Sequence, residues 1–384
     1  MIEREIQNEL VKLAGQFKAV AVVGPRQSGK TTLVRHVFKD KAYVNLENPD
    51  NRRYAIEDPR AFLAMYNSGA IIDEAQRAPE LFSYLQQLLD EDKKKGKFIL
   101  TGSNNFLLQE NISQSLSGRI AYLYLLPFTL SELSADKSSD LTTQLLRGSY
   151  PPVYDQNIDH DKWYPNYLRT YIERDVRQIK NISDLNTFER FLRLCAGRTG
   201  QLLNMSSLAI ETGVDSKTIG AWIGVLESSF VVFRLYPYYR NFNKRVVKMP
   251  KLYFYDTGLV CSLLGIRTGD QLVLHPLYGS LFENLIISEL KKHNFNRAGN
   301  ENLFFWRDNT GHEVDILIEQ NNNLLPVEIK SGKTITVEFF NGMNYWRKIS
   351  GTGRGIVVYS GEQPQTYSDG NQIIPWFALN SILD

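Results

Sequence analysis

The segment Gly24-Pro25-Arg26-Gln27-Ser28-Gly29-Lys30-Thr31 matches the pattern G-x-x-x-x-G-K-[ST] at every fixed position. An apolar, β-branched run of strand length, residues 17–23, precedes it, and residues 32–38 carry apolar side chains at helical spacing after it. A glycine-rich loop between a strand and a helix cradles phosphate, because its backbone N–H groups reach the oxygen atoms and the helix N-terminus favours an anion. The sequence therefore predicts a nucleoside triphosphate site, with Lys30 on the β- and γ-phosphates and the Thr31 hydroxyl on Mg²⁺. The residues expected to line it are Gly24, Pro25, Arg26, Gln27, Ser28, Gly29, Lys30, Thr31 and Thr32.

The composition is that of a globular chain with several domains. Its 384 residues, 43% of them hydrophobic, are enough for roughly two or three domains with buried cores. A net charge of +2 gives no overall attraction for nucleic acid, so any such site must be a local patch. Cys195 and Cys261 have neither metal-ligand nor redox spacing. Acidic residues occupy the N-terminal positions where a signal peptide would be apolar. No run approaches the ~20 apolar residues of a membrane helix. We therefore expect a cytoplasmic protein with two free thiols and no membrane span.

A pair of carboxylates ends a later strand. Residues up to about 135 alternate β-rich runs with helical segments, which predicts a parallel sheet with helices on both faces. Within them, the apolar run 69–74 ends in Asp73 and Glu74, the Walker B pattern with an adjacent glutamate. We expect Asp73 to orient a water molecule on Mg²⁺ and Glu74 to polarise the water that attacks the γ-phosphate. The alternative is a strand followed by a solvated acidic turn.

Small polar residues end the next strand. Residues 97–100, Lys-Phe-Ile-Leu, are predicted as a strand, and residues 101–104 are Thr-Gly-Ser-Asn. Because α/β sheets bind ligands at the carboxyl ends of their strands, Ser103 or Asn104 is a candidate contact to the γ-phosphate or to the attacking water. A simple turn is the alternative.

These motifs together resemble a known family. The segments GPRQSGKT at 24–31, AIIDEAQ at 70–76, ILTGSNNF at 99–106, SLSGRIAYLYLLPFTLSEL at 115–133, RGSYPPV at 147–153, YIERDV at 171–176 and KLYFYDTGL at 251–259 resemble the AAA-type ATPases of bacteria and archaea that carry a C-terminal domain of unknown function. The resemblance covers nearly the whole chain. It implies ATP as the nucleotide, which agrees with the lack of an evident N-K-x-D guanine-reading motif. It also makes Arg119 a candidate positive group that completes the phosphate site, although a surface role is equally open.

The middle of the chain predicts two helical modules. Residues 136–185 read as a helical linker or lid, in which 163–179 is an amphipathic helix. Its arginines, Arg169, Arg174 and Arg177, either form a solvated face or supply an arginine finger to a neighbouring subunit.

Residues 186–245 predict a winged helix-turn-helix, with Ser206-Ser207 and Asp215-Ser216 capping its helices and Gly213-Val214 forming the turn. Exposed Ser216, Lys217 and Thr218 would face DNA, but Lys217 is the only basic residue among them, so a structural module is the alternative.

Residues 246–384 predict a domain with a charged hairpin. The strands 313–318 and 325–330 flank an asparagine-rich turn, and a turn centred between Asn321 and Asn322 would pair position 315 with 328. Asp315, Glu328 and Lys330 would then lie together, as Mg²⁺-dependent phosphodiester hydrolysis requires. This arrangement resembles the PD-(D/E)xK nuclease core, which implies Asp315 and Glu328 as metal ligands, Glu283 as the helix carboxylate and Lys330 as a catalytic cation. A solvated hairpin face with alternating charges is the alternative.

The sequence thus predicts an α/β chain whose domains are a P-loop AAA-type core at 1–135, a linker or lid at 136–185, a winged helix-turn-helix at 186–245 and a restriction-endonuclease-like α/β domain at 246–384. The favoured function is ATP hydrolysis coupled to a nuclease-like domain that binds or cleaves DNA or another nucleic acid. The rival is an ATP-dependent switch whose nuclease-like domain is inactive and binds a protein partner. A nucleotide kinase is disfavoured because no small acceptor-binding lid is evident. A homo-oligomer is compatible with both readings.

Overall fold

The computed structural model divides the chain into two compact units, each described here by itself. The first comprises Met1–Phe128 with Ser228–Phe230 and Asn294–Gly299, and the second comprises Thr129–Glu227, Val231–His293 and Asn300–Asp384. The first boundary lies close to the predicted one at residue 135, whereas the predicted boundaries at 185 and 245 fall inside the second unit and stay predictions. The structure describes residues 2–103, 116–133, 140–176, 184–239, 246–299, 301–320 and 323–383.

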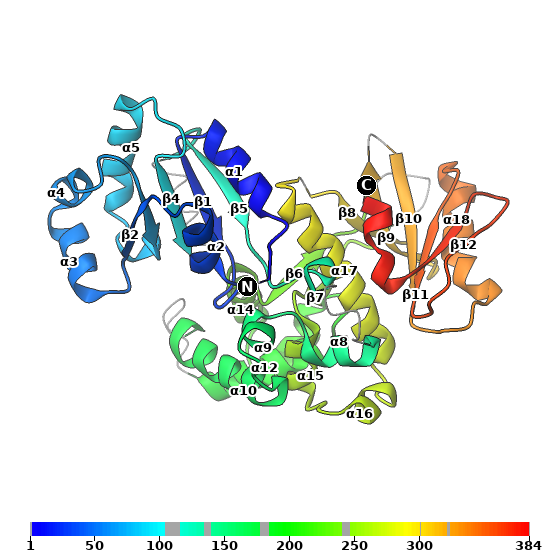
Figure 1. Ribbon diagram of the computed structural model, residues 1–384. Coiled ribbons are helices and arrows are strands. Elements are labelled where there is room, and N and C mark those ends of the chain that lie inside the picture. Colours follow the sequence, from blue (N-terminus) through cyan, green and yellow to red (C-terminus); the bar gives the residue numbers. More distant parts are fainter. Residues whose placement is uncertain are drawn as a thin grey trace. The chain divides into compact units, whose positions relative to one another are not determined.

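The first unit is built on a five-stranded parallel sheet flanked by helices, as predicted, with strand order β2-β3-β4-β1-β5 (Figure 1). β1 is the second strand from one edge, and all five of its residues are buried. Helices α1 and α2 pack Leu10 and Leu33 against Val20 and Val22 of β1 in one core cluster. The elements are α1 (Gln7–Gln16), β1 (Ala19–Val23), α2 (Lys30–Val37), β2 (Ala42–Asn45), α3 (Pro49–Glu57), α4 (Pro59–Ala64), β3 (Ala70–Asp73), η1 (Ala75–Arg77), α5 (Leu81–Glu91), β4 (Phe98–Gly102) and β5 (Ile120–Tyr124).

The parallel arrangement puts the predicted motifs at one edge of this sheet. β1, β3 and β4 run in the same direction, so the loop after Val23, the carboxylate Asp73 and the residues after Gly102 all lie at their carboxyl ends. Glycine is required at position 24 because a Cβ there would lie 2.0 Å from the carbonyl oxygen of Leu125. The sheet therefore gathers the loop and the Walker B segment where α/β sheets bind ligands.

The second unit begins with helices and a two-stranded antiparallel sheet. Residues 185–254 contain three helices followed by the pair β6–β7. The turn at Gly213 is left-handed, with φ 79°, and Asp215 caps the next helix through the N–H groups of Lys217 and Thr218, as expected. Asn204, not Ser206-Ser207, caps the preceding helix, because its side chain accepts the N–H of Ser207. The elements are α7 (Leu130–Leu133), α8 (Leu141–Arg147), α9 (Pro151–Asp155), α10 (His160–Thr170), the π-helical turn η2 (Tyr171–Val176), α12 (Leu185–Ala196), α13 (Met205–Thr212), α14 (Ser216–Ser228), β6 (Val232–Leu235), β7 (Lys251–Phe254), α15 (Thr257–Leu264) and α16 (Gly269–Val273).

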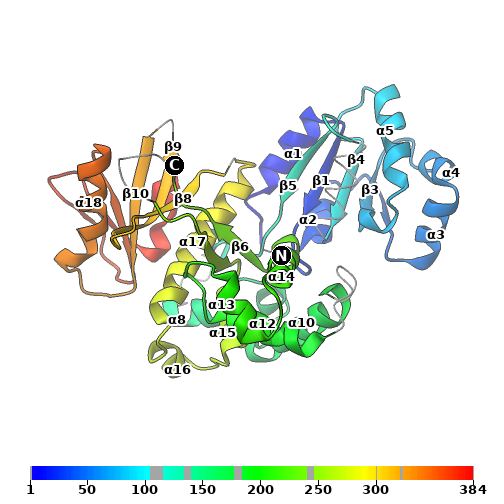
Figure 2. The same ribbon diagram turned by 180° about the vertical axis from the view of Figure 1, so that it is seen from behind.

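A six-stranded mixed sheet forms the C-terminal part of this unit. β8, β9 and β10 are antiparallel, while β10, β11 and β13 are parallel, and α18 lies along β9 and β10 (Figure 2). The predicted hairpin register is confirmed, since Gln320 lies opposite Asn323 and Ile316 opposite Val327; residues 321–322 themselves lie outside the described residues. The elements are α17 (Tyr278–Asn296), β8 (Leu303–Arg307), β9 (Glu313–Gln320), β10 (Asn323–Lys330), η3 (Val337–Phe340), α18 (Asn341–Ser350), β11 (Ile356–Tyr359), β12 (Gln365–Thr366), β13 (Gln372–Pro375), η4 (Trp376–Ala378) and α19 (Asn380–Leu383).

Two motifs of the family resemblance, RGSYPPV and KLYFYDTGL, bind each other inside this unit. The carboxylate of Asp256 accepts the backbone N–H and the hydroxyl of Ser149, at 2.7 and 2.9 Å, and also caps α15 through the N–H of Leu259. A Cβ at Gly258 would lie 2.5 Å from the ring of Tyr164, so only glycine fits there. These motif residues therefore have a packing role.

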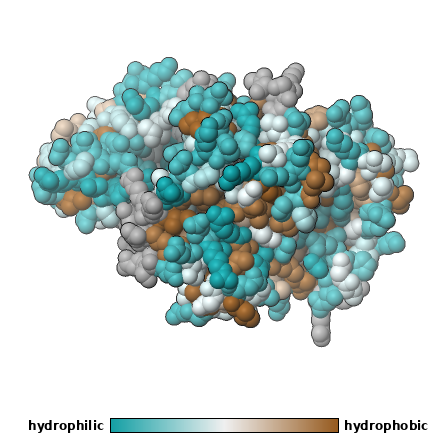
Figure 3. All heavy atoms as spheres, turned by 90° about the horizontal axis from the view of Figure 1, so that it is seen from below, coloured by the Kyte–Doolittle hydropathy of each residue, from teal (hydrophilic) through white to brown (hydrophobic). Residues whose placement is uncertain are grey.

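Hydrophilic side chains cover much of the face drawn in Figure 3, with hydrophobic residues exposed among them. Of the helices in the described parts of the chain, none combines the length and apolarity that crossing a membrane demands.

Candidate nucleotide site and carboxylate cluster

The phosphate loop wraps around its own lysine. Gln27 and Gly29 both have a left-handed backbone, with φ 62° and 91°, and α2 begins at Lys30. The buried Lys30 ammonium donates to the carbonyl oxygens of Gly24 at 2.9 Å and Pro25 at 2.7 Å. The lysine is thereby held over the loop at the N-terminus of a helix, where a triphosphate is expected to bind.

Asp73 meets three hydroxyl groups from neighbouring elements. Its carboxylate accepts the hydroxyl of Thr31 at 3.0 Å and that of Tyr43 at 2.7 Å, and Thr101 donates to its other oxygen. Burial, together with the hydrogen bond to Asp73 and the charge of Asp73, raises the pKa of Tyr43, which keeps this hydroxyl a donor. The sequence predicted that Thr31 and Asp73 act together, but it did not identify Tyr43 or Thr101.

Thr31 and Asp73 fit a magnesium ion. Mg²⁺ takes oxygen ligands, keeps several of its waters and needs only one or two protein groups besides the phosphates. A threonine hydroxyl and a carboxylate within hydrogen-bond distance, beside the phosphate loop, meet that requirement.

Glu74 is held by two side chains. One of its oxygens accepts the amide of Gln76 at 2.6 Å and the hydroxyl of Ser103 at 3.0 Å, while its backbone has the left-handed φ of 55°. Ser103, a candidate contact to the γ-phosphate or to the attacking water, donates its hydroxyl to Glu74 in this structure, and its contact to phosphate or water stays a prediction. The other candidate, Asn104, lies outside the described residues.

Arg4 braces the phosphate loop from the N-terminal segment. Its guanidinium donates to the carbonyl oxygens of Ser28 at 2.8 Å and Leu126 at 2.7 Å and lies 4.8 Å from the ring centroid of Phe128. Only 7% of Arg4 is exposed. This contact could not be predicted from the sequence, because an arginine among acidic residues near a terminus is usually solvated.

Arg119 is not brought to the phosphate loop of its own chain. It directly precedes β5, whose first residue pairs with Ala19 at the start of β1, whereas the loop follows the end of β1. Its guanidinium pairs with Asp90 at 2.9 Å, and this hydrogen bond lowers the pKa of Asp90. Among the other candidate arginines, Arg169 is exposed on α10, and Arg177 lies outside the described residues.

In the second unit, Asp315, Glu328 and Lys330 come together as predicted. The Lys330 ammonium lies 2.6 Å from a Glu328 oxygen and 3.2 Å from an Asp315 oxygen, which also accepts the N–H of Ile329 at 2.7 Å. Burial opposes ionisation of Asp315, but the charges of Lys330 and Lys251 hold its pKa below the usual value. Burial and the neighbouring Asp315 raise the pKa of Glu328 well above its usual value.

Glu283 belongs to an adjoining network. It accepts the ammonium of Lys251 at 3.0 Å and the hydroxyl of Tyr253 at 2.5 Å, and Lys251 also pairs with Glu313 at 2.5 Å. Burial and the charge of Asp315 raise the pKa of Glu283. The sequence did not identify Lys251, whose side chain is only 4% exposed.

The prediction that Asp315, Glu328 and Glu283 bind a metal ion stays a prediction. Within the described ranges, no three histidine, cysteine, aspartate or glutamate side chains are grouped so that they could hold a metal ion. Asp315 and Glu328 alone supply two carboxylates, and Glu328 Oε1 is buried with no hydrogen-bond partner in the described part of the chain. Two carboxylates fit a hydrated Mg²⁺ that also binds substrate phosphate, whereas Glu283 is already bound by Lys251 and Tyr253.

Three family models match successive parts of the chain. An AAA domain matches residues 16–134, and two domains of unknown function, DUF8612 and DUF4143, match residues 138–270 and 278–379. An uncharacterized protein of Mycobacterium tuberculosis is 32% identical over 97% of this chain and 83% of its own length. A second uncharacterized protein, from Methanocaldococcus jannaschii, is 24% identical over 85% of this chain and 77% of its own. A Walker-type ATPase of Pyrococcus abyssi, 15% identical, covers 68% of this chain and 96% of its own with a TM-score of 0.45.

Proposed function

The chain belongs to the same family as the mycobacterial protein, and since its first unit is an AAA-type P-loop domain, we propose that it binds Mg·ATP at the edge of that sheet and hydrolyses it. One observation carries the proposal: the hydroxyl of Thr31 and the carboxylate of Asp73 meet at 3.0 Å beside Lys30. Phosphoryl transfer to water uses this set of groups, namely the phosphate loop, Lys30, the Thr31 hydroxyl and the Asp73 carboxylate.

Each of these groups has a defined task. The backbone N–H groups within residues 26–31 and the Lys30 ammonium bind the β- and γ-phosphates. Thr31 and Asp73 would hold Mg²⁺ with one of its waters, and a bound Mg²⁺ would supply positive charge for the phosphates. Glu74 takes a proton from the attacking water once its carboxylate turns from Gln76 and Ser103 toward the γ-phosphate.

The test measures ATP turnover as phosphate release. Lys30→Ala and Asp73→Asn should each lower phosphate release at least about a hundredfold, because each removes a group that stabilises the transition state. Arg119→Ala serves as the control, because Arg119 precedes the amino-terminal end of β5, whereas the phosphate loop follows the carboxyl-terminal end of β1. Wild-type turnover in Lys30→Ala, with an unchanged circular dichroism spectrum, would refute the site.

We further propose that the second unit binds nucleic acid or cleaves it at Asp315, Glu328 and Lys330. The support is the convergence of the three side chains from β9 and β10 and the buried, unpaired oxygen of Glu328. In this proposal the two carboxylates hold Mg²⁺ and Lys330 stabilises the charge on the cleaved phosphate. The segment α13–α14 offers exposed Ser216 and Lys217 to DNA, while the Thr218 hydroxyl is bound to Asp215.

The rival function, a switch that cuts nothing and binds a protein, is favoured by a different observation. Lys251 and Tyr253 bind Glu283, so the helix carboxylate does not complete the metal site.

Incubation with supercoiled, linear and branched DNA and with RNA, in Mg²⁺ or Mn²⁺ and with or without ATP, separates the two functions. The nuclease would be established if Asp315→Asn abolishes cleavage. Lys30→Ala should leave that cleavage intact or only remove its dependence on ATP. An intact substrate in every reaction, beside normal ATP hydrolysis, would refute cleavage and favour the switch.

A further inference from the structure

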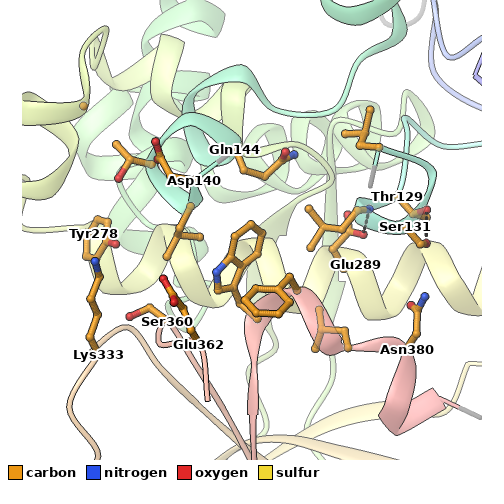
Figure 4. Close-up of a pocket in the computed structure, with 18 of the residues that line it drawn as sticks. Thr129, Ser131, Asp140, Gln144, Tyr278, Glu289, Lys333, Ser360, Glu362 and Asn380 are labelled. Atoms are coloured by element: carbon orange, nitrogen blue, oxygen red, sulfur yellow. Dashed lines mark hydrogen bonds between the residues drawn. The ribbon is translucent and has the colours of Figure 1, made fainter. Parts of the chain in front are cut away.

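A large cavity in the second unit belongs to neither of the sites above. It measures about 1120 Å³ and is bounded by residues of the ranges 129–133, 140–144, 269–293 and 333–380 (Figure 4). Its volume lies at or above the upper end of the range of about 300–1000 Å³ for pockets that hold small molecules. Figure 4 shows Tyr278 and Lys333 at one end of the cavity and Ser131 and Asn380 at the other, so it is elongated between them.

Apolar side chains form much of the cavity wall and reach the surface. Phe377 of η4 is 56% exposed and Val273 of α16 is 55% exposed. Leu274, next to Val273, is 84% exposed and extends this apolar surface beyond the cavity. The apolar lining residues include Leu130, Leu133, Leu141, Val273, Trp376 and Phe377. Exposed apolar side chains in a concave site mark a place where another molecule binds.

The charged groups of the lining are mainly acidic. Among the exposed charged residues of the lining, Asp140, Asp270 and Glu362 are acidic and Lys333 is basic. The buried Glu289 is neutralised by Lys292 at 2.6 Å. Burial and the charge of Asp140 raise the pKa of Tyr278, which agrees with the two side chains lying at the same end of the cavity. The cavity therefore presents a surplus of negative charge around an apolar wall.

We propose that this cavity binds an extended segment of a partner protein in which basic side chains alternate with large apolar ones. The apolar side chains pack on Trp376, Phe377 and Val273, and the basic ones pair with Asp270 and Glu362 or lie over the aromatic rings. Nucleic acid does not fit, since its phosphates would meet the same carboxylates. The inference rests on the lining residues alone and does not depend on ATP hydrolysis or on the Asp315 cluster.

Selection from short random peptides displayed on phage tests the ligand class directly. The full chain, the cavity variant Asp270→Lys/Glu362→Lys and the control variant Glu57→Lys/Glu80→Lys are used in parallel. The control reverses two exposed carboxylates of the first unit. We expect the wild type and the control to enrich peptides with a positive net charge and large apolar residues, and the cavity variant to bind them about tenfold more weakly.

Tryptophan emission gives a second readout of peptide binding. Of the chain's five tryptophans, all within described segments, Trp163, Trp222, Trp306 and Trp346 are at most 6% exposed, and Trp376 is the more exposed one. The most enriched peptide should shield emission from acrylamide in a saturable way, and Trp376→Phe should remove this effect. No enrichment above background, enrichment of acidic peptides, equal binding by the cavity variant, or shielding by an oligothymidylate in place of a peptide would each overturn the proposal.

Discussion

Replacement of Lys251 by methionine tests whether the second unit depends on its buried charge network. The side chain of Lys251 is 4% exposed, and its ammonium contacts Glu283 at 3.0 Å and Glu313 at 2.5 Å. Lys251→Met keeps most of the apolar stem but leaves both carboxylates without this cation. Loss of one partner from a buried ion pair costs about 3–5 kcal/mol of unfolding free energy, and we expect a loss of that order. Because Glu283→Gln removes the unpaired charge of Glu283, the double variant Lys251→Met/Glu283→Gln should recover part of the lost unfolding free energy.

The pH dependence of this loss has a definite sign. Burial and Asp315 already raise the pKa of Glu283, and Lys251 lowers it, so the pKa rises further when the lysine is removed. A carboxyl group whose pKa is raised by folding costs no stability below its unfolded pKa of about 4.3, and costs more as the pH rises above that value. The stability lost in Lys251→Met should therefore be larger at pH 8 than at pH 5.

Urea unfolding followed by circular dichroism at both pH values measures these differences. Lys162→Met is the matched control, because it removes a lysine from an ion pair with Asp159 in which both side chains are mostly exposed. The reasoning is refuted if Lys251→Met unfolds at the same urea concentration as Lys162→Met, or if its loss is equal at pH 5 and pH 8.

Three further outcomes are expected. Arg4→Met should lower the unfolding free energy of the first unit by about 2–4 kcal/mol in thermal melts and weaken binding of a fluorescent ATP analogue, since the carbonyl of Ser28 loses its donor; unchanged melting and binding would contradict the bracing role. Glu74→Gln should still bind that analogue but lower phosphate release about 10²- to 10⁴-fold, the range of a general base; a tenfold or smaller effect would remove Glu74 from catalysis. Burial raises the pKa of Cys261 to about 12 and also raises that of Cys195, so neither thiol should react with DTNB at pH 8 until denaturant is added.

Features that depend on neighbouring residues could be predicted from the sequence. The pairing of 315 with 328 follows from the centre of a short turn and the two-residue period of strands, and the confirmed register brings Lys330 to both carboxylates. The prediction of the phosphate loop depended only on a strand, a loop and a helix that follow one another in the sequence. In these cases a few consecutive residues determine which side chains can meet.

Contacts between distant segments could not be predicted in this way. Tyr43 and Thr101 reach Asp73 because β3 lies between β2 and β4. The order of strands in a sheet does not follow from their order in the sequence. Lys251 is separated from Glu283 by a whole helical segment, and Arg4 meets a carbonyl 122 residues away. Each of these residues carries a charge or hydroxyl that reads as solvated until its partner is known.

The charge balance of the second unit's cluster has a consequence for the order in which ligands bind. Four carboxylates, those of Glu283, Glu313, Asp315 and Glu328, are paired with three cationic groups, those of Lys251, Lys330 and Arg307. The raised pKa values of Glu283 and Glu328 fit this excess of negative charge, because a buried cluster favours protonation over an unpaired anion. A phosphodiester carries one more negative charge to the same place. If the cluster acts on nucleic acid, a bound Mg²⁺ would supply the missing positive charge, and DNA or RNA binding at Asp315 should require the metal.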